Sequence, residues 1–132
     1  MTIDHTTLFV PEDKFQACLT FYLEALEPLG YIIRHQFGEF VVGLGSPKED
    51  LSDYKRSDFW VCGTKAQPEG AAHVAFSCKD HATVDGFHAA GLKAGGKDNG
   101  APGLRPFYHS RYYAAFVLDP AGNNIEVVDH GY

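Results

Sequence analysis

The sequence lacks an excess of basic residues. Its 132 residues include 11 Lys and Arg against 17 Asp and Glu, which gives a formal net charge of −6. Proteins that bind nucleic acid present clustered positive charge to the phosphates, and the sequence contains no basic run. Nucleic acid is therefore not an expected partner.

Long apolar runs and secretion signals are also missing. No apolar stretch approaches the roughly 20 residues that a helix needs to cross a bilayer. The first residues, MTIDH, contain neither the basic nor the apolar region of a signal peptide. Three cysteines lie far apart in apolar text, which argues against a disulfide framework. These features predict a cytoplasmic protein with no membrane partner and with reduced thiols.

The sequence does contain an internal repeat. Residues 4–10 (DHTTLFV) and 71–78 (AAHVAFSC) are both strand-like, and each is headed by a histidine, His5 or His73. A helix pattern and a glycine stop follow each of them. A chain of this length forms one domain, which we divide into a first module (1–65), a linker (66–70) and a second module (71–132). If the modules pack about a pseudo-twofold axis, the two histidines face one cavity.

The first module reads as strand, helix and three strands. The spacing of one helical face appears in Phe15, Cys18, Leu19, Tyr22 and Leu26. Pro28 and Gly30 supply the stop. Strands are expected at 31–35, 40–44 and 58–62, with a polar loop at 46–56.

The second module repeats this order with a different middle. A helix is opened by Asp80 or Thr83 and ends at Gly95 and Gly96. Residues 97–106 (KDNGAPGLRP) are interrupted by glycine and proline, which favours a functional loop over a regular strand. Such a loop could cover the cavity as a lid. Strands are expected at 112–118 and 124–128. Both modules therefore read βαβββ, which predicts an α+β fold.

Three pieces of the sequence carry a family resemblance. They are the His-headed first strand with the helix that ends at 29–31 (LGY), the segment 73–76 (HVAF), and the segment 116–126 (FVLDPAGNNIE). Together these pieces resemble the vicinal oxygen chelate superfamily, which includes glyoxalase I, bleomycin-resistance proteins and extradiol dioxygenases. The resemblance implies paired βαβββ modules whose curved sheets form an open, barrel-like arrangement around a metal or ligand site.

The resemblance also implies a metal site. Family ligands come from the first and last strands of each module, and His5, His73 and Glu126 occupy three of those four places. Trp60 occupies the fourth, where it cannot ligate but could bind substrate by stacking. Two imidazoles and a carboxylate suit a divalent ion with open positions, and Fe, Mn, Zn, Ni and Co all remain candidates. His5 alone would ordinarily be a strand-end residue, and Glu126 could instead face solvent.

The segment 105–113 (RPFYHSRYY) is dense in groups that bind anions or transfer protons. Tyrosine and histidine can act as general acid or base, which makes Tyr108, His109 and Tyr113 candidate catalytic residues. Arginine can hold a carboxylate through two hydrogen bonds, which makes Arg105 and Arg111 candidate substrate-binding residues.

The sequence predicts a metalloenzyme of the lyase or dioxygenase type, acting on a small oxygenated metabolite that chelates the metal. The alternative is a metal-free small-molecule binder that sequesters a drug, as bleomycin-resistance proteins do. A non-catalytic structural relative is a third alternative. The modules could pair within one chain or be exchanged between two, so a homodimer is also possible.

Overall fold

The computed structural model describes residues 3–66 and 69–131. In the first module, strands β1 (Thr6–Pro11), β2 (Ile32–Gln36), β3 (Val41–Gly45) and β4 (Phe59–Thr64) accompany helix α1 (Phe15–Ala25). In the second, strands β5 (His73–Cys78), β6 (Lys97–Leu104), β7 (Tyr113–Leu118) and β8 (Asn124–Asp129) accompany helix α2 (His81–Lys93). Three short 3-10 helices, η1 (Glu12–Lys14), η2 (Glu27–Leu29) and η3 (Pro47–Glu49), lie in the first module.

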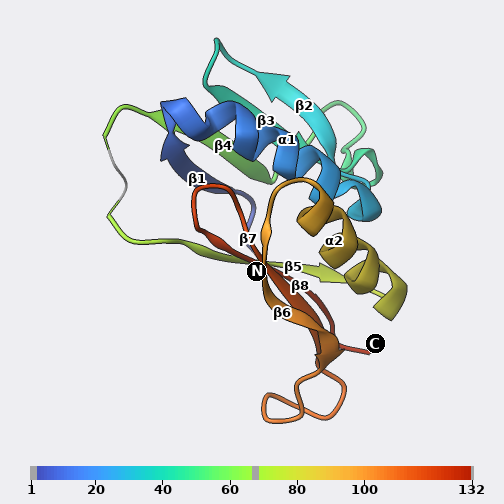
Figure 1. The fold of residues 1–132 in the computed structure, drawn as a ribbon. Helices are drawn as coiled ribbons and strands as arrows, with labels where there is room; N and C mark the ends of the chain where they lie inside the picture. Colours follow the sequence, from blue (N-terminus) through green and yellow to red (C-terminus); the bar gives the residue numbers. More distant parts are fainter. Residues whose placement is uncertain (1–2, 67–68, 132) are drawn as a thin grey trace.

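The two modules share one topology. The strand order is β1-β4-β3-β2 in the first sheet and β5-β8-β7-β6 in the second. In each sheet the first strand runs parallel to the last, and the other neighbours are antiparallel. This confirms the α+β fold of two βαβββ modules, built as two open four-stranded sheets (Figure 1).

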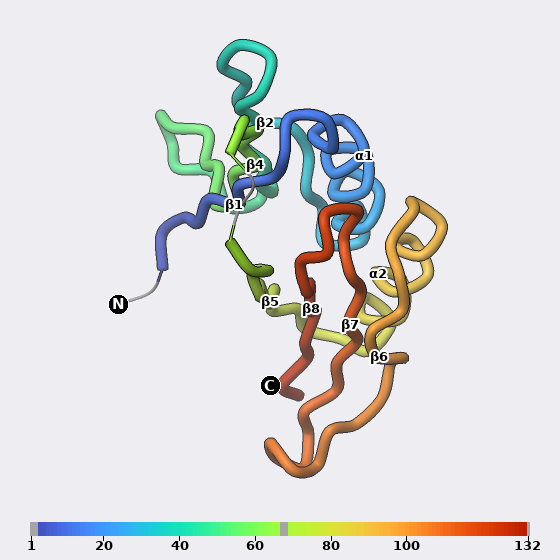
Figure 2. Tube along the Cα trace, turned by 60° about the vertical axis from the view of Figure 1, so that its left-hand side comes forward, coloured from blue at the N-terminus to red at the C-terminus, as the bar shows by residue number. Residues whose placement is uncertain are grey.

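The core lies where each helix covers its own sheet and the two helices meet. Figures 1 and 2 show α1 and α2 as neighbours, and the two helices contact each other. Alternate strand residues point toward the helices and are buried, among them Leu8, Val10, Val42, Leu44, Phe59, Val61, Ile125 and Val127. Because successive side chains of a strand point to opposite faces, the other residues of these strands lie on faces that no helix covers. We call these the open faces.

The start of α2 and the stop after α1 lie where the sequence predicts them. Asp80 is the N-cap of α2, and its Oδ1 accepts a 2.7 Å hydrogen bond from the backbone N–H of Thr83. After α1 and η2, Gly30 adopts a left-handed conformation (φ 81°) that a glycine adopts without strain. Within the described residues, no helix is long and apolar enough to cross a membrane.

The loop predicted at 97–106 is largely a strand, so that prediction was wrong. Residues Lys97–Leu104 form β6, which pairs with β7 at the edge of the second sheet. Its register shifts twice, between Asp98 and Gly100 and between Gly100 and Gly103. Proline has no backbone N–H to donate to a neighbouring strand. Pro102 is tolerated in β6 because an edge strand has no neighbour on its outer side, where an N–H would need no partner. The projecting turn instead lies between β6 and β7, as both views show.

Candidate functional site

Glu126 is the buried acid at the centre of the second sheet's open face. It lies on β8 opposite Ala75 of β5 and Phe116 of β7, on the side away from the helices. Its exposed fraction is only 3%. A carboxylate removed from water needs strong hydrogen-bond or charge partners, so the groups around it define the site.

Two side chains approach the carboxylate of Glu126 from opposite sides. His73 Nε2 lies 3.2 Å from Oε2, and the hydroxyl of Tyr112 donates a 2.5 Å hydrogen bond to Oε1. Burial, followed by the hydrogen bond to Glu126, raises the pKa of Tyr112 above its ordinary value. The phenol therefore stays protonated at neutral pH and acts as a donor.

The ring of His73 is oriented by the backbone. Its Nδ1 lies 3.2 Å from the carbonyl oxygen of Asn124, which can only accept, so the proton is on Nδ1. Nε2 then faces the carboxylate with a lone pair unless a proton or a cation lies between them. Metal-ligating histidines are commonly fixed in this way through their second nitrogen.

The spacing of this pair suits a divalent ion. Two adjacent ligands at about 2.1 Å from an octahedral ion lie roughly 3 Å apart, close to the 3.2 Å between His73 Nε2 and Glu126 Oε2. The donor set is one imidazole and one carboxylate, with the second carboxylate oxygen already held by Tyr112. These two residues therefore fit a metal, although two protein ligands alone would leave most of its coordination sphere to other groups.

His5 does not join this pair within the chain. It precedes β1, and its Nδ1 lies 2.8 Å from Oδ1 of the exposed Asp4. Across residues 3–66 and 69–131, no three His, Cys, Asp or Glu side chains form a group that could hold a metal ion. The three residues predicted as ligands are therefore not assembled in one protomer.

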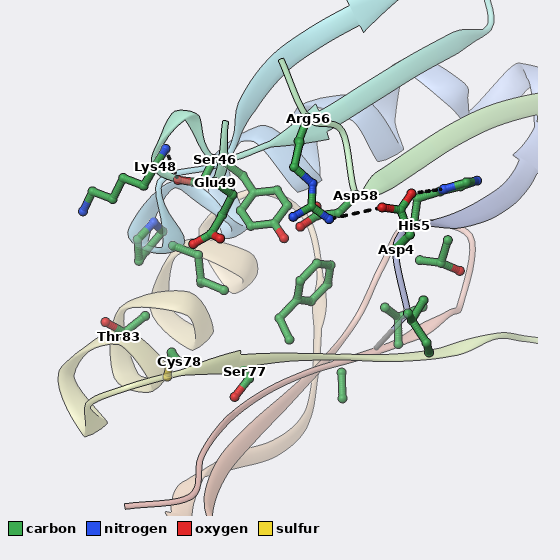
Figure 3. Close-up of a pocket in the computed structure, with 18 of the residues that line it drawn as sticks. Asp4, His5, Ser46, Lys48, Glu49, Arg56, Asp58, Ser77, Cys78 and Thr83 are labelled. Atoms are coloured by element: carbon green, nitrogen blue, oxygen red, sulfur yellow. Dashed lines mark hydrogen bonds and ion pairs between the residues drawn. The ribbon is translucent and has the colours of Figure 1, made fainter. Parts of the chain in front are cut away.

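The two histidines nevertheless line one cleft. It lies between the modules, has a volume of about 780 Å³, and includes His5, His73, Tyr31, Arg56 and Asp58 in its lining. Figure 3 shows the His5 ring at one end of this cleft beside Asp4, while Arg56 reaches toward the same aspartate. The cleft mixes charges of both signs, so it selects no ligand charge by itself.

The pairing register relates Trp60 to Glu126. Trp60 lies opposite Thr7 of β1 and Gly43 of β3, as Glu126 lies opposite Ala75 and Phe116. Its indole is on the open face of the first sheet, and its N–H donates to the carbonyl oxygen of Ser57 at 3.2 Å. The first sheet thus has an indole at the place where the second has a carboxylate.

The residues predicted in 105–113 separate into several environments. Arg105 lies over the ring of Phe116 (5.6 Å to its centroid) and donates to the carbonyl of Ala101. Arg111 donates to the carbonyl of Gly131. His109 Nε2 lies 2.9 Å from Nδ1 of His130.

The three predicted catalytic residues do not meet at Glu126 in the structure. Tyr108 is 60% exposed in the β6–β7 turn and contacts the Tyr112 ring. Tyr113 points to the helix side, where its hydroxyl donates to Asp85. The tyrosine that reaches Glu126 is Tyr112, which sequence reasoning missed. Counting back in twos from Phe116, which shares the face of Glu126, would have indicated Tyr112.

Residues 119–123 (DPAGN), which belong to the family-like segment 116–126, stabilise the fold. Asp119 is buried and accepts hydrogen bonds from the backbone N–H groups of Ala121 and Asn123, the side-chain amide of Asn123, and the hydroxyl of Tyr22. This carboxylate closes the β7–β8 turn and ties it to α1. The DPAGN segment therefore positions β8, and with it Glu126, without facing the site.

The three thiols are free in the structure. Burial raises the pKa of Cys18 to about 12 and also raises those of Cys62 and Cys78. Thiols in this state are poor nucleophiles at neutral pH.

Comparison with solved structures identifies the fold. A glyoxalase/bleomycin resistance protein from Albidiferax ferrireducens T118 superposes with a TM-score of 0.72 at 22% identity, over 94% of this chain and 96% of the other. The chain has the glyoxalase/bleomycin-resistance/dioxygenase fold. A family enzyme of that description from Burkholderia phytofirmans PsJN gives a TM-score of 0.70 at 18% identity, over 98% of both chains.

Other structures of this fold include a lactoylglutathione lyase from Agrobacterium tumefaciens. It aligns with a TM-score of 0.61 at 20% identity, over 97% of this chain and 92% of the other. No protein-family model matches the sequence, and no curated protein matches it either. At these identities the likeness establishes the fold alone.

Proposed function

We propose that the protein is a metal-dependent enzyme of the glyoxalase or dioxygenase type, acting on a small oxygenated metabolite in the cytoplasm. His73 and Glu126 hold a divalent ion, and Tyr112 fixes the carboxylate. The observation that carries this proposal is the 3.2 Å approach of His73 Nε2 to Glu126 Oε2, with the other nitrogen of His73 already on a carbonyl. When bound, the ion would polarise an oxygen of the substrate as a Lewis acid.

His5 is the third ligand in this proposal. It lines the same cleft as His73, and in the chain it is paired with the exposed Asp4. It reaches the metal either by movement of the segment before β1 or from a second copy of the chain. Both routes use a residue that no regular element holds in place.

Metal content tests the proposal directly. Protein purified without chelator or histidine tag should contain stoichiometric divalent metal by elemental analysis. Glu126→Gln, which keeps the size and the Tyr112 contact but removes the charge, should lose it, and His5→Ala should weaken it. His88→Ala is the control, because His88 pairs with Asp98 away from Glu126. Unchanged metal content in Glu126→Gln would refute the site.

Mixing two defective variants distinguishes the routes for His5. If the site is shared between copies, a heterodimer of His5→Ala with a His73→Ala, Glu126→Gln double variant regains one complete site. If His5 serves its own chain, mixing restores nothing.

A metal-free binder is the second candidate function. It is favoured by the indole at Trp60, which puts an aromatic plane on the first sheet at the position matching Glu126. Absence of stoichiometric metal, together with tight binding of an aromatic ligand, would favour this function over the enzyme.

A further inference from the structure

A pair of histidines joins the turn between β6 and β7, which projects from the second module in Figure 1, to the segment after β8. His109 lies in the turn and His130 directly follows β8, and Nε2 of His109 lies 2.9 Å from Nδ1 of His130. Both residues are half-buried. Beside them, the guanidinium of Arg111 donates a 3.1 Å hydrogen bond to the carbonyl oxygen of Gly131. We call His109, Arg111, His130 and Gly131 the histidine clamp.

The clamp adjoins Tyr112, the residue that holds Glu126. The ring of Tyr112 lies edge-on to both imidazoles, at centroid distances of 5.4 Å from His109 and 5.2 Å from His130. The hydroxyl at the far end of the ring donates to Oε1 of Glu126. The place of the phenol beside Glu126 therefore depends on two rings that the clamp fixes.

The hydrogen bonds of the clamp determine where its protons lie. The backbone N–H of Arg111 donates to Nδ1 of His109 at 3.2 Å, so the proton of a neutral His109 is on Nε2. Nε2 then donates to Nδ1 of His130, which accepts. This arrangement does not suit a metal ion, because a ligating histidine offers the lone pair of one nitrogen and donates the N–H of the other. The pair is thus built to share a proton.

A proton taken up by the neutral pair has to bind a nitrogen that already accepts a hydrogen bond. The two acceptors are Nδ1 of His109 and Nδ1 of His130, and each would then point its N–H at another N–H. A second proton would leave two cations facing each other. Histidine ordinarily changes its charge between about pH 5 and 8. Mild acid should therefore break the clamp.

Other charged and titratable groups surround the pair without forming part of its hydrogen bonds. The hydroxyl of Tyr112 points to Glu126, and the ring of Tyr108 lies on that of Tyr112. Asp129 accepts the N–H of Gly131 at 2.7 Å and lies 3.6 Å from Nε2 of His81. The guanidinium of Arg111 is the charged group of the clamp itself. None of the clamp hydrogen bonds named here uses a carboxylate, so proton uptake replaces none of them with an ion pair.

We infer that His109 and His130 are positioning residues, which hold Tyr112 against Glu126 while they are neutral and release it when they take up protons. The carboxylate at the centre of the second sheet's open face thus keeps its orienting donor at neutral pH and loses it in mild acid. The inference concerns the contact between Tyr112 and Glu126, so it does not require a bound metal.

Nuclear magnetic resonance of the isotopically labelled protein, with no metal added, tests the inference. Overhauser effects between ring protons of His130 and Tyr112 should be present at pH 8 and lost on acidification, over the range in which the His109 and His130 resonances titrate. The amide spectrum should otherwise stay dispersed. Effects that persist after both histidines are protonated would overturn the inference. So would histidines that stay neutral until the whole protein unfolds.

Matched variants separate proton uptake from packing. His130→Asn keeps an acceptor near the position of Nδ1 but takes up no proton there, so the Tyr112 ring resonances should stay unchanged between pH 8 and 5. His130→Leu removes the acceptor and should release Tyr112 at both pH values. His88→Asn is the control, because His88 pairs with Asp98, and it should respond to acid as the parent does.

Two further points keep the test decisive. His109→Gln, whose amide can present either an N–H or an oxygen to His130, replaces His130→Asn if that variant loses its dispersed amide spectrum. A parent-like acid response in the folded substitute for either histidine would overturn the inference. Because the readout is the position of Tyr112 without metal, it can fail while the His73–Glu126 metal site holds, and the metal site can fail while the clamp holds.

Discussion

The hydroxyl of Tyr22 donates a 2.5 Å hydrogen bond to Oδ2 of Asp119, which lies 97 residues further along the chain. Both residues are buried, and together they join α1 of the first module to the β7–β8 turn of the second. Burial, followed by the nearby Asp119 charge, raises the pKa of Tyr22 well above its ordinary value, so the phenol remains a donor. The modules are thus connected by a buried polar contact.

Tyr22→Phe should destabilise the protein by about 1–3 kcal/mol, because it removes a donor from a buried carboxylate. Urea unfolding followed by circular dichroism measures the change. Tyr113→Phe is the matched control, since its hydroxyl bonds the exposed Asp85 and its loss should cost within about 0.5 kcal/mol. Equal effects of the two substitutions would show that burial of the Tyr22–Asp119 bond adds nothing.

Alkaline pH should destabilise the fold, in part through Cys18. Its pKa rises from an ordinary value of 9.0 to about 12 in the folded protein, because the buried thiolate is desolvated. The folded state therefore binds more protons than the unfolded state above pH 9. Stability is fully present below pH 9 and falls as the pH rises from 9 toward about 12, by at most about 1.4 kcal/mol per pH unit for this one group.

The substitution Cys18→Ala tests this alkaline effect. Urea unfolding at pH 7, 8, 9 and 10 should show a shallower loss of stability above pH 9 in the variant than in the parent protein. An identical slope in both would mean that Cys18 contributes nothing to the pH dependence.

Tyr112→Phe should weaken the proposed metal site without removing either ligand. Groups that orient ligands commonly change metal affinity by about 10–100-fold, and the Tyr112 hydroxyl is the one that bonds Glu126. Competition with a chromophoric chelator measures the affinity. Tyr108→Phe, in the exposed part of the same turn, should have no effect. A Tyr112→Phe protein with unchanged metal affinity would leave Tyr112 with no role in holding Glu126.

Trp60→Leu and Glu126→Gln should have opposite consequences. The first removes the indole from the open face of the first sheet and should reduce binding of an aromatic ligand, 2-naphthol, measured by calorimetry, while metal content stays constant. The second should abolish metal binding and retain naphthol binding. If either substitution removes both activities in folded protein, the two sheets carry one coupled site instead of two.

The sequence predicted the modules well because their evidence is local. Helical spacing, the Asp80 cap and the glycine stops each act within a few residues, so α1, α2 and most strands are where we expected them. Strand β6 was missed because Pro102, Gly100 and Gly103 disfavour a central strand, whereas this strand lies at an edge. Edge position depends on the whole sheet and cannot be determined from the segment itself.

The candidate site was only partly predictable. The pairing of His73 with Glu126 follows from strand register, which the repeat indicated. The sequence predicted Tyr113, whereas Tyr112 reaches Glu126. Neighbouring residues of a strand point to opposite faces, so an error of one residue places the side chain on the wrong face. The position of His5 depends on a segment before the first strand, whose path no periodic pattern specifies.

The alternation of buried and open residues along each strand has an evolutionary consequence. Along each strand, a residue that holds a helix against the sheet is followed by one that could meet a ligand. The two kinds of residue therefore lie on opposite faces of the sheet. Substituting Trp60 or Phe116 changes what the sheet presents, whereas substituting Val61 or Val117 changes what keeps the molecule folded. New specificities can therefore arise by exchanging residues of the open faces, while the residues that hold the helices against the sheets stay the same.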